Sequence, residues 1–301
     1  MKILVTGSHG QLGNELRRLI KEGHSEIGPI PEAYASADVD YIDIEDLDIS
    51  DAAAVDSWFD VHGPYDLAIN CAAMTNVDGC EANFPTAFAA NALGPMNLAR
   101  ACSRQGATLV QVSTDYVFPG NVEGERLESD VPAPISAYGR SKLAGEGLAL
   151  AANPRTFVLR TAWLYGYVGK NFVKTMLRLA ETHDRVTVVD DQMGNPTSAN
   201  DLAHEILSLA VTGVYGIYHC TNEGTCSWAD FAQATFEEFG KGCGVVRCTS
   251  EEYKRANPAS ADRPRFSALR NARLEATIGN QMRPWREALR SYRQNFDELA
   301  G

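Results

Sequence analysis

The sequence predicts an α/β fold: a Rossmann-like, doubly wound parallel sheet with a smaller C-terminal mixed α/β substrate lobe. Short apolar runs alternate with longer amphipathic stretches, which is typical of βα units around a parallel sheet. The first apolar run leads directly into a glycine-rich turn and then into a helical pattern. The chain has 301 residues, 45% of them hydrophobic and 22% charged, so it is long enough to bury a full core.

Four short apolar runs are predicted as strands of the sheet. Each is bounded by polar or turn residues, as expected for strands that are buried on both faces. They are Lys2–Thr6, Asp66–Ala72, Ala107–Ser113 and Thr156–Ala162. The segment from Gly28 to Asp46 has a poor pattern, so we expect a long irregular connection around one short strand.

Three helices are predicted between these strands. The first starts at Gln11, after which apolar residues recur every three or four positions and form one stripe. The second starts near Ser50, whose hydroxyl can cap the free amides of the first turn. The third lies between Pro85 and Gln105, where Gly94–Pro95 should start a new helix or kink the old one.

The pattern changes after residue 165, where the regular alternation loosens into mixed helices and short strands. Strands are expected within Gly213–Cys220 and Val245–Cys248, and Pro284 is expected to open a terminal helix. We therefore predict a dinucleotide-binding domain over residues 1–165. Residues 166–301 are predicted to form a smaller, partly interleaved substrate lobe.

Charge and hydropathy narrow the possible partners and location. The chain has 39 acidic and 27 basic residues, a net charge of −12, so its surface should repel nucleic acid and anionic membranes. No stretch approaches the roughly 18 apolar residues of a membrane span. The first apolar run meets Thr6–Gly7 too soon to form a signal-peptide core. We expect a cytoplasmic protein with no nucleic-acid or membrane partner.

The seven cysteines and six histidines show no spacing typical of a metal site. We expect reduced thiols, most of them small buried side chains, and no metal.

Three glycines follow the first strand and open the first helix. Gly7 permits a tight turn, Gly10 removes the side chain that would block a pyrophosphate, and Gly13 lets helix and strand pack closely. The free amides at the helix start then face the phosphate charge. This context predicts a bound dinucleotide, NADH or NADPH, and the glycine spacing resembles the extended short-chain dehydrogenase/reductase family.

The choice between the two cofactors stays open at this point. An acidic residue at the end of the second strand would bind the ribose of NADH, and Asp38, Asp40, Asp43 and Glu45 are candidates. An arginine in the first helix, at position 17 or 18, would favour NADPH.

Tyr138 and Lys142 are four residues apart at a predicted helix start, which puts both side chains on one face. They follow the strand that ends near Thr114, and ligands bind at the carboxyl ends of parallel strands. The alternative is an exposed Tyr and Lys on a solvated helix.

We predict a carbonyl reduction at this position. Tyr138 donates a proton to the carbonyl oxygen, and Thr114 holds that oxygen by a hydrogen bond. Lys142 binds the nicotinamide ribose and lowers the pKa of Tyr138.

Several widely separated motifs resemble one branch of the extended short-chain reductases, the dTDP-4-dehydrorhamnose reductases. In chain order, they include Asn70–Asp78, Ser113–Gly120, Tyr138–Glu146, Arg160–Tyr165 and Asp191–Thr197. The resemblance covers nearly the whole chain. It implies a Rossmann domain, a nucleotide-sugar lobe and NAD(P)H-dependent reduction of the 4-keto group of dTDP-4-dehydro-L-rhamnose to give dTDP-L-rhamnose.

The resemblance also implies a role for individual residues. The catalytic positions are Thr114, Tyr138 and Lys142. The cofactor positions are Gly7, Gly10, Gln11, Leu12, Gly13, Asp48, Ile49, Ala72, Ala73, Ser113, Tyr138 and Lys142. The substrate positions are Val77, Thr114, Tyr116, Trp163 and Arg263. As alternatives, Trp163 is compatible with a core position and Arg263 with a surface charge.

Two other functions share these features. An epimerase or dehydratase acting on a nucleotide sugar has the same glycine turn and Tyr–Lys pair, but it regenerates its cofactor. A non-catalytic NADP-binding regulatory subunit, similar to that of methionine adenosyltransferase, would keep only the nucleotide site. We expect a monomer or a homodimer. Glu15 matches an acidic position that binds a bridging magnesium in some relatives, but Asn200 replaces a second expected carboxylate.

Overall fold

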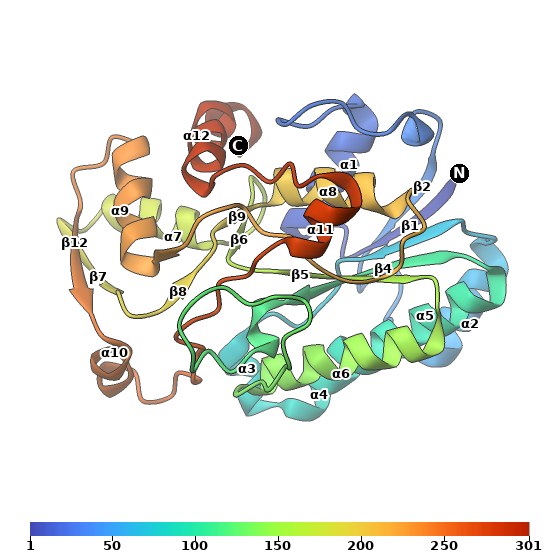
Figure 1. The fold of residues 1–301 in the computed structure, drawn as a ribbon, viewed down its shortest axis with the longest axis horizontal. Helices are drawn as coiled ribbons and strands as arrows, with labels where there is room; N and C mark the ends of the chain where they lie inside the picture. Colours follow the sequence, from blue (N-terminus) through green and yellow to red (C-terminus); the bar gives the residue numbers. More distant parts are fainter. Residues whose placement is uncertain (301) are drawn as a thin grey trace.

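A six-stranded parallel sheet forms the centre of the computed structural model, which describes residues 1–300 (Figure 1). Its strands are β1 (Lys2–Thr6), β2 (Asp38–Ile42), β3 (Leu67–Asn70), β4 (Thr108–Thr114), β5 (Thr156–Thr161) and β10 (Gly216–His219). Their order is β10-β5-β4-β3-β1-β2, and every neighbouring pair is parallel. The predicted α/β class is confirmed, and the four predicted strands are found within a few residues of their expected ends.

Helices cover both faces of this sheet (Figure 1). One face carries α1 (Gln11–Glu22), α8 (Ala199–Ala210) and α11 (Ala272–Ile278), and the other carries α2 (Ala52–His62), α5 (Gly94–Gln105) and α6 (Ala137–Ala152). Successive side chains of β1 point to opposite faces. Ile3 therefore packs with Leu16 of α1, whereas Leu4 packs with Phe59 of α2. Both faces of the sheet are thus buried, as in a doubly wound fold.

The segments between these elements refine the predicted boundaries. Helix α2 is capped by Asp51 rather than by Ser50, because the Asp51 carboxylate accepts hydrogen bonds from two first-turn amides. A new helix, α5, does begin at Gly94. Three short helical segments precede it: α3 (Val77–Ala82), α4 (Phe84–Phe88) and a π-helical turn over Ala89–Leu93. The connection from residue 28 to 46 is irregular, with one short strand, β2, as predicted.

Beyond residue 165 the chain contributes to two parts of the molecule. Helix α8, strand β10 and helix α11 return to the sheet. The other elements build a separate layer: α7 (Phe172–Ala180), β7 (Arg185–Val189), α9 (Trp228–Glu238), β12 (Gly244–Cys248), α10 (Ser250–Ala256) and α12 (Trp285–Leu299). Two short strand pairs connect these layers: β6 (Leu164–Tyr165) with β9 (Thr197–Ser198), and β8 (Met193–Gly194) with β11 (Cys226–Ser227). Residues 166–300 therefore contribute to both layers, and the division into a sheet domain and a substrate lobe stays a prediction.

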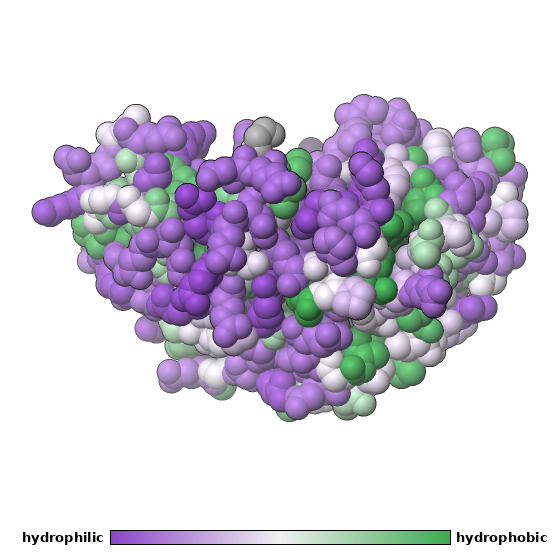
Figure 2. Space-filling view, turned by 90° about the horizontal axis from the view of Figure 1, so that it is seen from above, coloured by the Kyte–Doolittle hydropathy of each residue, from purple (hydrophilic) through white to green (hydrophobic). Residues whose placement is uncertain are grey.

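The face of the molecule in Figure 2 is mostly hydrophilic, and its hydrophobic residues form small separate patches. Among residues 1–300, no helix combines the length and the apolar character that crossing a bilayer requires. All seven cysteines have free thiols.

Candidate active site

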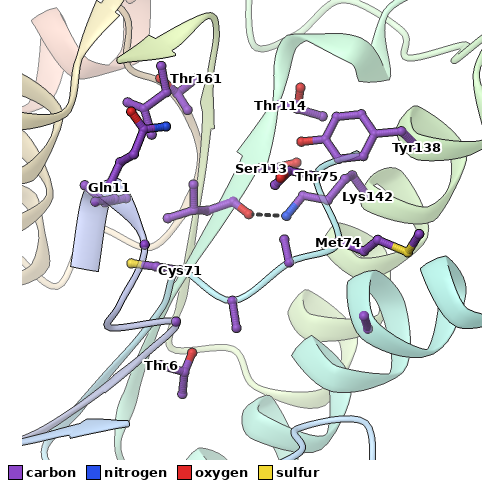
Figure 3. A pocket seen from close by; sticks show the side chains of 18 of the residues that line it. Thr6, Gln11, Cys71, Met74, Thr75, Ser113, Thr114, Tyr138, Lys142 and Thr161 are labelled. Atoms are coloured by element: carbon purple, nitrogen blue, oxygen red, sulfur yellow. Dashed lines mark hydrogen bonds between the residues drawn. The ribbon is translucent and has the colours of Figure 1, made fainter. Parts of the chain in front are cut away.

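A cavity of about 770 Å³ lies at the carboxyl ends of the central strands (Figure 3). This volume falls within the roughly 300–1,000 Å³ of small-molecule sites, and the position is the usual one for open parallel sheets. The predicted residues that line it are Gly7, Gly10, Gln11, Leu12, Asp48, Ile49, Ala72, Ala73, Ser113, Thr114, Tyr138, Lys142 and Trp163. Residues predicted from distant parts of the sequence therefore meet in one cavity.

The glycine turn forms one wall of this cavity. Gly7 has a φ of +65°, and a Cβ at this position would lie 2.6 Å from the backbone nitrogen of Ala72. A Cβ on Gly13 would lie 2.5 Å from the Gly7 carbonyl oxygen. A Cβ on Gly10 would meet only that same oxygen, at 3.2 Å. Gly7 and Gly13 are thus required by packing, whereas Gly10 keeps space free beside the turn.

The start of α1 fits a bound pyrophosphate. Its N-cap residue is Gly10, so no side chain caps the amides of the first turn. Those amides and the positive end of the helix dipole are free to bind phosphate oxygens. Gly13 supports this wall through packing and does not line the cavity.

One of the four acidic candidates for binding the ribose of NADH follows the end of β2. Strand β2 ends at Ile42, and Asp43 follows it and lines the cavity. The Asp43 carboxylate accepts a hydrogen bond of 2.9 Å from the His9 backbone nitrogen. The Arg17 guanidinium lies 4.6 Å from the centre of the Tyr41 ring, close to the same strand end. Both a ribose-binding acid and a phosphate-binding arginine are therefore near the cofactor end of the cavity.

Helix α6 forms the opposite wall. The Ser136 hydroxyl accepts a hydrogen bond from the Gly139 amide and fixes the helix start. Tyr138 and Lys142 lie one turn apart, and both line the cavity. Figure 3 shows the Tyr138 hydroxyl directed toward Thr114, with the Lys142 ammonium beside it. The Lys142 Nζ donates a 2.7 Å hydrogen bond to the Val112 carbonyl oxygen, and Lys142 is buried, whereas Tyr138 is half-buried.

Burial dominates the electrostatics of this pair. It raises the pKa of Tyr138 above its ordinary value, and a hydrogen bond with Thr114 opposes this rise. It lowers the pKa of Lys142 to about 8, and the charge of Glu146 opposes this fall. Desolvation of the phenolate is the largest cause of the rise in the Tyr138 pKa, and the predicted lowering of that pKa by Lys142 stays a prediction. Tyr138 therefore keeps its proton at neutral pH, as a proton donor must.

The hydroxyl of Thr114 already makes two hydrogen bonds within the protein. It donates a 2.9 Å hydrogen bond to the Asp115 carboxylate and accepts one of 3.1 Å from the Tyr116 amide. In this structure the Thr114 hydrogen is directed at Asp115, and the predicted bond from Thr114 to a ketone oxygen stays a prediction. Asp115 lines the cavity and was not singled out from the sequence. Burial raises the pKa of Asp115 to about 6.

The predicted substrate residues occupy different positions. Trp163 lines the cavity, has a φ of +46° and stacks on Trp228 with 3.6 Å between ring centres. Val77, Tyr116 and Arg263 do not line the cavity. Val77 begins α3, Tyr116 packs edge-on against Tyr138, and the Arg263 guanidinium lies 3.6 Å from the Asp78 carboxylate.

Among residues 1–300, one group of acidic and histidine side chains brings metal-ligating atoms close together, and this group is not fully buried. His9, Asp43 and Glu45 bring ligating atoms within 4.8 Å of one another, but His9 and Glu45 are exposed. The Glu15 carboxylate accepts hydrogen bonds of 2.8 Å from Arg18 and 2.9 Å from Asn200. An arginine thus already neutralises the charge of Glu15.

The parallel sheet, the glycine turn after β1 and the Tyr–Lys pair beside β4 together define a class, the nicotinamide-dependent short-chain dehydrogenases/reductases. Within this class, the chain belongs to the RmlD substrate binding domain family, whose sequence model matches residues 1–298.

Individual relatives agree with this assignment. The chain is 43% identical over 296 residues to a dTDP-4-dehydrorhamnose reductase of Mycobacterium tuberculosis, covering 96% of this chain and 91% of the relative. A dTDP-4-dehydrorhamnose reductase structure from Clostridium acetobutylicum superposes with a TM-score of 0.91 at 44% identity, covering 99% of this chain and 100% of the other. A second such reductase, from Bacillus anthracis in complex with NADP, gives 0.88 at 37% identity, covering 97% and 98%.

Proposed function

We propose that the protein reduces the 4-keto group of dTDP-4-dehydro-L-rhamnose with NADH or NADPH and releases dTDP-L-rhamnose. The observation that carries this proposal is the Tyr138–Lys142 pair on one wall of a cavity whose other wall is a glycine turn with uncapped amides. The M. tuberculosis and C. acetobutylicum relatives, both dTDP-4-dehydrorhamnose reductases, support the choice of substrate.

The cofactor would be held along the floor of the cavity. The amides that follow Gly10 bind its pyrophosphate, and the residues predicted for its backbone are small where they approach it, as at Ala72 and Ala73. Asp48 and Ile49 line the cavity, and we assign them to the adenine end of the cofactor. An ammonium has three donors, and Lys142 uses one of them on Val112, so two remain for the nicotinamide ribose. When bound, the reduced nicotinamide supplies a hydride to the carbonyl carbon.

The proton comes from Tyr138. Its raised pKa keeps the phenol protonated, and its hydroxyl is directed toward the Thr114 hydroxyl. We assign Thr114 the role of orienting Tyr138, because Asp115 accepts the Thr114 hydrogen. Tyr138 then donates its proton to the oxygen on which negative charge develops, and solvent restores that proton after product release.

The sugar nucleotide would extend from this centre toward the C-terminal lobe. Trp163 offers a flat apolar surface for the sugar, and Tyr116 packs behind Tyr138. Arg263 provides a guanidinium for the diphosphate. This guanidinium lies beside the Asp78 carboxylate of α3, the helix that begins at Val77. These substrate roles are the ones that the sequence predicts.

The test is an assay of the purified protein with dTDP-4-dehydro-L-rhamnose and either NADH or NADPH, following nicotinamide absorbance and product mass. The proposal requires one reduced cofactor to be consumed for each sugar that gains two hydrogens. An epimerase or dehydratase would change the sugar while leaving the absorbance constant. Product formation without cofactor consumption would therefore contradict the proposal.

Location and assembly follow from the same proposal. Because NADH and NADPH are cytoplasmic metabolites, we place the protein in the cytoplasm. We propose a monomer or a homodimer, and light scattering of the purified chain would distinguish these two states.

A further inference from the structure

A buried ion pair lies directly behind the Tyr138–Lys142 wall. The Arg160 guanidinium of β5 binds both carboxylate oxygens of Glu146 on α6, at 2.9 and 2.7 Å. The Ser113 hydroxyl of β4 donates a 2.5 Å hydrogen bond to the same carboxylate. Each of these three residues is at most 4% exposed.

The sheet register explains why these three groups meet. Ser113 and Arg160 are direct neighbours across β4 and β5. Neighbouring residues of parallel strands point to the same face, here the face covered by α6. Glu146 is one helical turn beyond Lys142, so both project toward β4. The carboxylate therefore contacts the strand that carries Ser113 and Thr114.

Stability alone does not account for this pair. Taking two charges out of water costs a large part of their mutual attraction, and apolar pairs of similar volume often stabilise a core at least as well. The Arg160 Nη1 atom is also buried without a hydrogen-bond partner, which adds to the cost. The Glu146–Arg160 pair lies beside Lys142 and Ser113, and this position indicates a role in the active site.

We propose that Glu146, fixed by Arg160, is a positioning residue that holds Ser113 in place and keeps a negative charge one turn from the Lys142 ammonium. It touches neither substrate nor cofactor and acts through these two neighbours. This inference rests on the proposed function, because it assigns Lys142 a role in holding the cofactor.

The other groups that face Lys142 cannot supply this charge. Cys71 follows β3 and Cys80 lies on α3, and burial raises the pKa of both thiols, so they stay neutral. Tyr138 is also protonated at neutral pH. From β4, Lys142 receives only the Val112 carbonyl dipole. The Glu146 carboxylate is thus the anion that opposes the lowering of the Lys142 pKa by burial.

The test is the Glu146→Gln substitution, which keeps the shape of the side chain and removes its charge. NADH fluorescence gives the dissociation constant of the cofactor between pH 6 and pH 10. In the wild type, binding should weaken as Lys142 loses its proton near pH 8. In the variant, the midpoint of that weakening should move down by about one pH unit. The pH profile of kcat/KM for the keto-sugar should move by the same amount.

Two further variants separate this role from a structural one. Glu146→Gln leaves Arg160 unpaired and can fail to fold, so a double variant, Glu146→Met with Arg160→Met, removes both charges and should show the same downward shift. Glu15→Gln removes another buried, arginine-paired carboxylate far from Lys142, and it should leave the midpoint unchanged. A folded Glu146 variant with the wild-type midpoint would overturn the proposal.

The same data distinguish a failure of this inference from a failure of the proposed function. If the NADH-binding midpoint shifts but no keto-sugar is reduced, the Glu146 role stands and the proposed reaction falls. If the sugar is reduced and the midpoint does not shift, the reaction stands and the Glu146 role falls.

Discussion

The two walls of the cavity offer a ligand different kinds of groups. The α1 wall presents backbone, because Gly7 and Gly10 remove side chains and leave the first-turn amides free. The α6 wall presents titratable side chains, Tyr138 and Lys142, held in a buried setting. Backbone amides do not titrate, so binding to the α1 wall should be insensitive to pH. The chemistry on the α6 wall should depend on both proton state and position.

The largest expected effect tests whether the α6 wall performs the chemistry. Tyr138→Phe removes the proton donor and keeps the ring, so kcat should fall by about 10³-fold while the Kd for NADH changes less than threefold. Tyr34→Phe is the matched control, because the Tyr34 hydroxyl is buried and donates to Leu207 far from the site. Steady-state rates and NADH fluorescence measure the two quantities. An unchanged kcat in Tyr138→Phe would remove the acid role from this wall.

The next prediction concerns the stability cost of placing a lysine on the α6 wall. The pKa of Lys142 is about 8 in the folded chain against an ordinary 10.5. Between these values the unfolded chain binds more protons, so folded-state stability rises with pH through this window, by roughly 3 kcal/mol. Lys142→Met removes the free-energy cost of burying the charged lysine. It also removes the hydrogen bond to Val112, which contributes about 1 kcal/mol.

Lys142→Met should therefore be inactive and, at pH 7, about 2 kcal/mol more stable than the wild type; it should become slightly less stable above pH 10.5. Urea unfolding at several pH values measures this difference. Lys241→Met, at an exposed lysine, is the control for the loss of a lysine side chain. A difference between Lys142→Met and the wild type that stays constant from pH 7 to pH 11 would contradict the burial argument.

The two walls also differ in how much of them the sequence could predict. The α1 wall was predictable because each requirement is local: a strand, a turn and a helix within a few residues of Gly7. The Tyr138–Lys142 spacing is equally local. By contrast, the Glu146–Arg160 pair depends on the register of β4 against β5, which no short sequence pattern specifies. A period of four residues from Tyr138 through Lys142 to Glu146 was the one available signal.

Electrostatic details were the least predictable part of the site. The raised pKa of Tyr138 follows from burial by many residues, whereas the sequence shows only its neighbour Lys142. The bond from Thr114 to Asp115 joins adjacent residues, but its direction depends on side-chain torsions. Similarly, Asp51 and Ser50 are both good capping residues, and only the backbone decides that Asp51 caps α2.

The third prediction examines the α1 wall. Gly10→Ala adds a methyl group that meets only the Gly7 oxygen, at 3.2 Å, so the fold should be retained. The methyl occupies space beside the free amides, and the Kd for NADH should rise about 10- to 30-fold with the same factor at pH 6 and pH 8. Gly13→Ala is the contrasting variant, because its methyl would lie 2.5 Å from backbone and should lower stability by about 2 kcal/mol. If the factor by which Gly10→Ala raises the Kd for NADH differed between pH 6 and pH 8, binding to the α1 wall would not be insensitive to pH.

The smallest effect sharpens the comparison within α6 itself, between the face that forms the cavity wall and the face that meets solvent. A Cβ at Gly147 would meet nothing within 4 Å, so Gly147→Ala should stabilise the chain by about 0.5–1 kcal/mol through helix propensity alone. A Cβ at Gly145 would lie 2.1 Å from the Asn91 carbonyl oxygen, so the same substitution there should destabilise the chain and push the helix away from its support. Thermal unfolding of both variants measures the difference in sign.

Because α6 carries Tyr138 and Lys142, Gly145→Ala should also lower kcat, whereas Gly147→Ala should leave it at the wild-type value. Equal unfolding temperatures for the two variants would contradict the claim that close packing at Gly145 positions Tyr138 and Lys142 in the cavity.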